Sequence, residues 1–208
     1  MSNVIHLHLP SEIEQSLTTF AQQVIAQPNQ FILNDEIFKT EDAPLYDIHD
    51  DNIPALSDHF ILNHNLNSVT WKEPNDLHTN ALSWLYKLSF PPVKTCVRLF
   101  ECLEDTVQLN LTQHRGNFLY PQGGFMGWHT NSDFPGTRVY VAYSTAERGS
   151  YFKYVDRTNQ DNPNIITDWD NAGWTVRIFC PSNIPSEYLW HCVGAPNATR
   201  MSFGFLLK

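Results

Sequence analysis

Short runs rich in Val, Tyr, Phe and Trp dominate the C-terminal half of the chain. Turn-forming Pro, Gly, Asn and Asp residues separate these runs. Runs of this kind are typical of β-strands, and many of them at such intervals predict a sandwich or a jelly roll. We therefore expect about eight strands, at 97–102, 106–112, 125–129, 138–143, 151–155, 174–180, 188–193 and 201–207.

The N-terminal half has a mixed pattern. Apolar and polar side chains alternate over 4–9, which indicates a short strand. The tetrapeptide 11–14 fits a capping box, and apolar residues at helical spacing follow it until Pro28, so that a helix is expected here. Leucines predict a second helix over 77–88. The stretch 31–72 carries scattered Pro, Asn and Asp, which favour loops with short elements.

These elements predict one domain over residues 1–208 of a mixed but mainly β class. Residues 1–95 form a helical and irregular support region in this interpretation, and its helices pack on one sheet. Residues 96–208 form the jelly-roll core. We find no linker between the two halves.

Charge and composition exclude several classes of protein. The chain has 13 Lys and Arg against 22 Asp and Glu, a net charge of −9, and no long basic run, which argues against a nucleic-acid partner. No apolar stretch is long enough for a membrane span, and residues 1–10 lack the pattern of a secretory signal. No CxxC pair occurs, and four cysteines are too few for a disulfide scaffold, so that reduced thiols and a cytoplasmic location are expected. The cysteines are Cys96, Cys102, Cys180 and Cys192.

Two histidines are the first candidates for chemistry. His129 ends an expected strand before a turn, and His191 lies in another expected strand 62 positions later. A single histidine in a strand is usually a core residue, but Arg200 and Ser202 follow on the last strand. Side chains two apart on a strand share a face, and a guanidinium beside a hydroxyl is suited to binding a carboxylate.

This arrangement resembles the Fe(II)- and 2-oxoglutarate-dependent oxygenases. An early His with a polar residue two positions on, a distal His about sixty residues later, and Arg-x-Ser on the last strand are similar to that family's pattern. The family fold is a double-stranded β-helix, in which two antiparallel sheets of a jelly roll surround the metal. The neighbouring segments 120–129, 138–143, 149–152 and 172–179 also resemble the family's strands.

The resemblance implies a role for each residue. His129 and His191 would be iron ligands, as in a facial triad of two histidines and a carboxylate. Arg200 would bind the distal carboxylate of 2-oxoglutarate, Ser202 would add a hydrogen bond, and Tyr120 would also reach that carboxylate. The implied activity is a dioxygenase, a hydroxylase that couples oxidative decarboxylation of 2-oxoglutarate to oxidation of a small-molecule or peptidyl substrate.

One position departs from the family pattern. The family has Asp or Glu two residues after the first His, whereas this chain has Asn131. The third iron ligand could therefore be Asp133, Asn131 or no side chain. The departure leaves two further hypotheses open. One is a binding protein with a degraded or differently occupied metal centre, and the other is a halogenase-like variant.

Other polar residues have weaker interpretations. We interpret 114–116 as a hairpin loop near the barrel mouth and 168–171 as a structural polar turn. His6-x-His8 places two imidazoles on one strand face, which is typical of a polar outer face. Arg138 and Lys153 could hold an anionic substrate.

Overall fold

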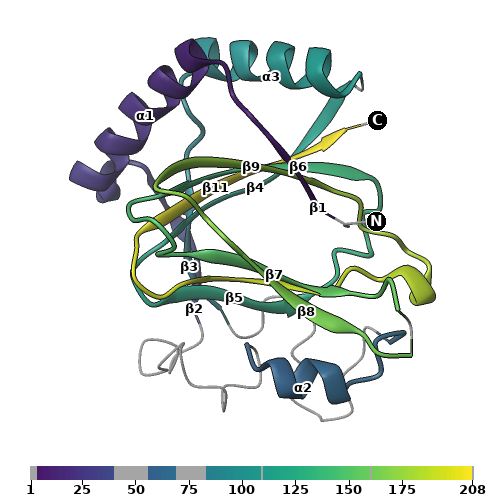
Figure 1. Cartoon of the computed structure of the whole chain (residues 1–208). Coiled ribbons are helices and arrows are strands. Elements are labelled where there is room, and N and C mark those ends of the chain that lie inside the picture. Colours follow the sequence, from purple (N-terminus) through teal and green to yellow (C-terminus); the bar gives the residue numbers. More distant parts are fainter. Residues whose placement is uncertain (1–3, 40–55, 69–82, 109, 160, 208) are drawn as a thin grey trace.

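The computed structural model describes residues 4–39, 56–68, 83–108, 110–159 and 161–207. Strands dominate this part of the chain, and three α-helices accompany them (Figure 1). The helices are α1 (Ser11–Ala26), α2 (Asp58–Asn63) and α3 (Val93–Val107). The strands are β1 (Val4–Leu7), β2 (Ile32–Lys39), β3 (Ser83–Leu88), β4 (Leu111–Tyr120), β5 (Gly124–His129), β6 (Thr137–Ser144), β7 (Tyr151–Asp156), β8 (Asn164–Trp169), β9 (Gly173–Phe179), β10 (His191–Ala195) and β11 (Arg200–Leu207).

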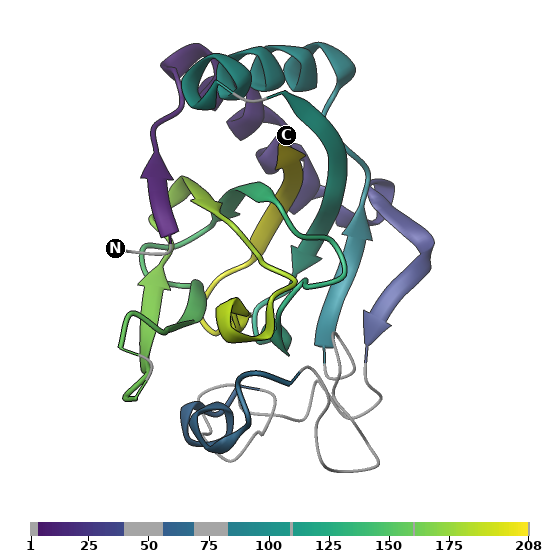
Figure 2. The same cartoon turned by 90° about the vertical axis from the view of Figure 1, so that its right-hand side faces the viewer.

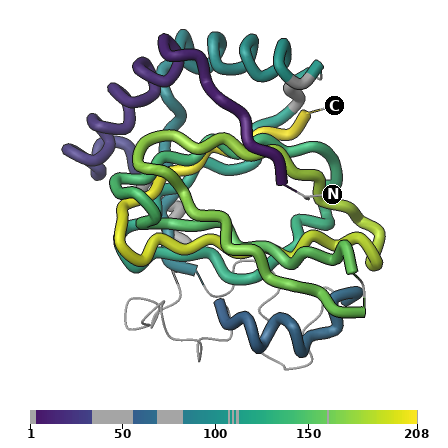
Figure 3. The backbone as a smooth tube through the Cα atoms, in the orientation of Figure 1, coloured from purple at the N-terminus to yellow at the C-terminus, as the bar shows by residue number. Residues whose placement is uncertain are grey.

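The strands form a curled antiparallel sheet with the order β1-β9-β6-β11-β4-β3-β5-β10-β7-β8, and β2 pairs with β3. The sheet bends where β4 passes to β3, so that its two halves face each other as two layers (Figure 3). The predicted mainly β jelly-roll architecture is confirmed. Two strands of the region 1–95, β1 and β3, pair with strands of the expected core, and the boundary at residue 95 stays a prediction.

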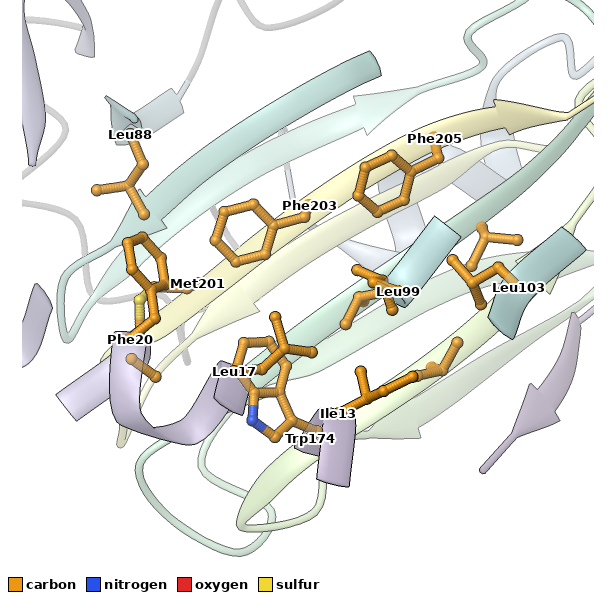
Figure 4. Packing of buried hydrophobic residues seen from close by; sticks show 14 of the residues in the cluster. Ile13, Leu17, Phe20, Leu88, Leu99, Leu103, Trp174, Met201, Phe203 and Phe205 are labelled. Carbon is orange, nitrogen blue, oxygen red and sulfur yellow. The ribbon is translucent and has the colours of Figure 1, made fainter. Parts of the chain in front are cut away.

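Helices α1 and α3 cover the outer face of the layer that contains β9, β6, β11 and β4 (Figures 1 and 2). The expected helix at the N-terminus is confirmed, and it packs on one sheet as predicted. Its buried Leu17 and Phe20 lie in one cluster with Leu99 of α3 and Phe203 of β11 (Figure 4). This cluster covers the outer face of that layer with apolar side chains, and a separate cluster that includes Met126, Phe152 and Phe179 packs between the two layers.

The start of α1 differs from the predicted capping box. Pro10 is the N-cap residue, and no side chain makes a capping hydrogen bond there. Ser11 is already the first helical residue, and the extended backbone of Pro10, whose ring fixes φ, precedes it. Pro28 starts a short 3-10 turn after the helix, as its fixed φ allows.

The predicted strand at 97–102 is wrong, because these residues belong to α3. Pro92 is the N-cap of that helix, and the buried Cys96, Leu99 and Leu103 recur at spacings of three and four. This period is that of a helix, whereas the high apolar content of the run suggested a strand. The same helix takes the first residues of the predicted strand at 106–112.

The predicted helix at 77–88 is wrong over Ser83–Leu88, which form β3, and residues 77–82 lie outside the described part. The spacing of Leu85 and Leu88 suits a helix, but Trp84 and Tyr86 favour a strand and alternate with buried neighbours. Pairing with β2, β4 and β5 decides the outcome. Tertiary context has here overridden local propensity.

Two predicted loops are strands. The expected hairpin at 114–116 lies inside β4, and the expected polar turn at 168–171 begins inside β8. Conversely, β10 starts only at His191, three residues later than expected. In the described part of the chain, no helix has the length and apolar character needed to cross a membrane.

Candidate functional site

The two candidate histidines lie directly opposite each other on neighbouring strands. His129 ends β5, His191 begins β10, and the two are register partners. Their ring centroids are 4.1 Å apart, and both residues are buried. The structure therefore brings together two imidazoles that are 62 positions apart in the sequence.

Backbone carbonyls fix the tautomer of both rings. Nδ1 of His129 lies 2.8 Å from the carbonyl oxygen of Gly127, and Nδ1 of His191 lies 2.8 Å from that of Leu189. A carbonyl oxygen only accepts, so each Nδ1 donates and each Nε2 keeps its lone pair. Metal-binding histidines are commonly held in this way.

Both imidazoles are neutral at pH 7. Burial lowers the pKa of His129 to about 4, and the positive charge of Arg138 acts in the same direction. Burial also lowers the pKa of His191 well below its usual value, with contributions from His129 and Arg138. Neutral imidazole is the form that binds a metal ion.

A β-bulge turns His129 toward the interior. Moving two residues along β10, from His191 to Val193, moves the partner on β5 by three residues, from His129 to Met126. Met126 and His129 both line the same small cavity, although residues three apart on a regular strand face opposite sides. The extra residue restores a common face, as bulges near binding sites often do.

Arg200 presents a free donor to this cavity. The cavity measures about 20 Å³ and lies between the layers, and Arg200, Tyr120, Ser202 and His129 are among its lining residues. Arg200 is 1% exposed, and within the described residues nothing accepts a hydrogen bond from its buried Nη1 atom. Burial raises the pKa of Tyr120 to about 12 although Ser202 hydrogen-bonds to it, so that Tyr120 keeps its proton. Arg200, Tyr120 and Ser202 thus line one cavity together.

A buried carboxylate holds Arg200 in this position. Oδ2 of Asp170 accepts from Nε of Arg200 at 2.9 Å and from the hydroxyl of Ser150 at 2.5 Å, and Oδ1 accepts from Arg177. Burial alone would raise the pKa of Asp170, but the guanidinium groups of Arg200 and Arg177 hold it below its usual range. Because Asp170 occupies Nε, the buried donor of Arg200 that has no partner among the described residues is Nη1.

The network continues to the surface of the molecule. Nε of Arg177 donates to Asp168 at 2.8 Å, and Nε2 of His6 lies 2.8 Å from the same carboxylate oxygen. His6 is thus a partner of Asp168. The sequence analysis interpreted 168–171 as a structural polar turn but did not connect Asp168 and Asp170 with Arg177 and Arg200.

The two candidates for a third metal ligand lie in different places. Asn131 has a left-handed backbone with φ 56°, which asparagine tolerates, and its Nδ2 donates to Nε2 of His191 at 2.9 Å. Asp133 lies in the exposed turn that follows. Among the described residues, no three His, Cys, Asp or Glu side chains form a group that could hold a metal. The structure therefore brings Asn131, and not Asp133, to the histidine pair.

Comparison with known proteins supports the fold. No protein-family model matches the chain, and no curated protein matches its sequence. A crystal structure of a Pseudomonas putida prolyl-4-hydroxylase is similar, with a TM-score of 0.52 and 10% sequence identity. The alignment covers 99% of this chain and 93% of that one. At this identity the likeness concerns the fold alone, and it agrees with the jelly roll described above.

Proposed function

We propose that this protein is an Fe(II)- and 2-oxoglutarate-dependent oxygenase that acts as a hydroxylase. One observation carries the proposal. Two neutral imidazoles face each other on β5 and β10, and one of them, His129, lines a small cavity that is also lined by the buried Arg200, whose Nη1 has no partner among the described residues. A cation site beside a carboxylate site is what iron and a keto diacid require.

Each residue has a defined task in this proposal. His129 and His191 would hold the iron through Nε2, and Arg200 would bind the distal carboxylate of 2-oxoglutarate with the hydroxyl groups of Ser202 and Tyr120. Bound iron would supply the oxidative chemistry, while the protein orients the cosubstrate and excludes water. Both histidines are buried, which fits the exclusion of water from the site.

Cosubstrate binding requires side chains to move. A volume of about 20 Å³ is room for about one water molecule. Met126 and the half-buried Arg115 line the cavity and have flexible side chains that can withdraw. Asn131 would likewise leave Nε2 of His191 when iron binds, and its amide oxygen could then serve as the third ligand.

Turnover is the direct test. The purified protein, supplied with Fe(II) and 2-oxoglutarate, should produce succinate, and His129→Ala and His191→Ala should each abolish this reaction. Arg200→Ala should raise the 2-oxoglutarate concentration that is needed by roughly 10- to 100-fold, because a charge-assisted hydrogen bond is lost. An exposed histidine provides the matched control, His8→Ala, which should behave as the unmodified protein does. Absence of succinate with the unmodified protein would refute the proposal.

One contact favours a second function, a binding protein without turnover. The amide of Asn131 occupies the lone pair of His191, so that the histidine pair has a protein partner even without metal. This alternative predicts metal or ligand binding without succinate formation. A halogenase-like activity would instead depend on added halide.

A further inference from the structure

Arg138 lies on the inner face of the barrel, close to the histidine pair. Its register partners across β6 are Phe179 on β9 and Leu206 on β11. The ring of Phe179 is 5.5 Å from that of His191, measured between centroids. Tyr140, two residues after Arg138 on the same strand, lines the cavity that His129 also lines. Residues two apart share a face, so Arg138 points into the same interior.

The guanidinium of Arg138 lacks a counterion. The residue is 2% exposed, and its Nη2 donates to the backbone oxygen of Phe134 at 2.9 Å. Its buried Nε has no hydrogen-bond partner, and no carboxylate pairs with it among the residues that the structure describes.

Arg177 shows how this fold treats a buried arginine that serves structure. It is 1% exposed, and two carboxylates, Asp168 and Asp170, neutralise it. Arg138 is equally buried but has only a neutral carbonyl. A buried charge without a partner is costly, so Arg138 is expected to have an anionic partner beyond the residues that the structure describes.

We propose that Arg138 binds a carboxylate group of the substrate, beside the histidine pair and separate from the carboxylate that Arg200 binds. Naming this ligand the substrate rests on the proposed function. A groove of about 750 Å³ lies next to this end of the barrel, and its walls include Gly136 and Leu189. These residues precede Arg138 and His191 by two positions, and Arg138 itself does not line the groove. In the proposal, a carboxylate-bearing molecule approaches from this side.

The observations favour Arg138 over the other basic candidate. The ammonium group of Lys153 lies 2.8 Å from a carboxylate oxygen of Asp58, so its charge is already matched. A single carboxylate carries the one negative charge that Arg138 needs, and it can accept from Nε in the planar geometry that a guanidinium prefers.

The first experiment measures carboxylate binding by isothermal titration calorimetry. The probes are N-acetylated amino acids with a free carboxylate, each paired with its carboxamide, and they are tested with and without Mn(II) and N-oxalylglycine. We expect carboxylates to bind and their carboxamides not to bind. Arg138→Met should weaken the carboxylate affinity about tenfold or more, and Arg138→Lys should weaken it less.

The second experiment measures thermal unfolding without ligand. Arg138→Met should raise Tm because it removes an unmatched buried charge, whereas the matched control Arg177→Met should lower Tm because it removes a buried cationic partner from both Asp168 and Asp170. A lowered Tm or a failure to fold in Arg138→Met would show a structural role and overturn the proposal.

Two binding results would also overturn it. One is that no carboxylate probe binds, and the other is that Arg138→Met weakens N-oxalylglycine alone, which would assign Arg138 to the cosubstrate. Carboxylate binding that depends on Arg138 in a protein without succinate formation would refute the oxygenase and leave the anion site intact.

Discussion

Acid should destabilise the metal-free protein between pH 6.5 and pH 4 because of the two buried histidines. The pKa of His129 falls from 6.5 to about 4 on folding, so the unfolded chain takes up a proton in this range and the folded chain does not. At about 1.4 kcal/mol per pKa unit, His129 alone removes about 3 kcal/mol by pH 4. His191 acts in the same direction, because its pKa is also lowered.

Urea unfolding at several pH values measures this loss. Where both histidines are protonated only in the unfolded chain, the free energy of unfolding should fall by roughly 3 kcal/mol per pH unit. The buried Asp170 contributes in a different range. Its pKa lies below the unfolded value of 3.8, so the stability it provides is present above that pH and is lost only in stronger acid.

A double variant isolates the cause. His129→Gln with His191→Gln should flatten the dependence between pH 6.5 and pH 4, whereas the exposed His8→Gln should leave it unchanged. A free energy of unfolding that stays constant over this range in the unmodified protein would refute the assignment of two buried neutral imidazoles. The same conclusion would follow if the double variant kept the full slope.

Three further outcomes can be measured independently. Asp170→Asn should cost about 3–5 kcal/mol in urea unfolding because it leaves the buried guanidinium of Arg200 without a carboxylate and removes one of the two carboxylates of Arg177, and Asp168→Asn should cost less because that carboxylate is partly exposed; equal costs would contradict the network. Leu17→Ala should cost about 2–5 kcal/mol, since the side chain is fully buried between α1 and the sheet; a cost near zero would contradict that packing. Asn131→Asp should strengthen Mn(II) binding roughly tenfold or more, because a carboxylate is a better ligand than an amide; unchanged affinity would remove position 131 from the metal site.

The sequence was informative where a strand pattern and a chemical motif coincided. His129, at the end of one expected strand, and His191, inside another, were paired through the resemblance to a family motif, and the structure places them opposite each other in register. Arg200 and Ser202 share a face of β11, as their spacing of two requires, and both line the cavity. Their proposed roles in binding iron and cosubstrate stay predictions.

Long-range partners could not be read from local patterns. Asp170 resembled a turn residue, and only the folding of β8 against β7 and of β9 beside β6 brings it to Arg200. Residues 97–102 were predicted as a strand because their apolar content suits a strand as well as a helix. Pro92, the N-cap of α3, is the local signal that favours a helix start here. Contacts between residues distant in sequence decided both cases.

The bulge in β5 has a consequence for any redesign of this chain. Removing one residue between Met126 and His129 would leave every remaining side chain chemically unchanged and the strand still able to hydrogen-bond with β10. His129 would then project toward the outer face of the sheet, where the neighbouring Trp128 packs, and His191 would face no second imidazole. The facing arrangement of the two candidate metal ligands therefore depends on how many residues this short strand contains. A single deletion would separate the two imidazoles in a protein that still folds.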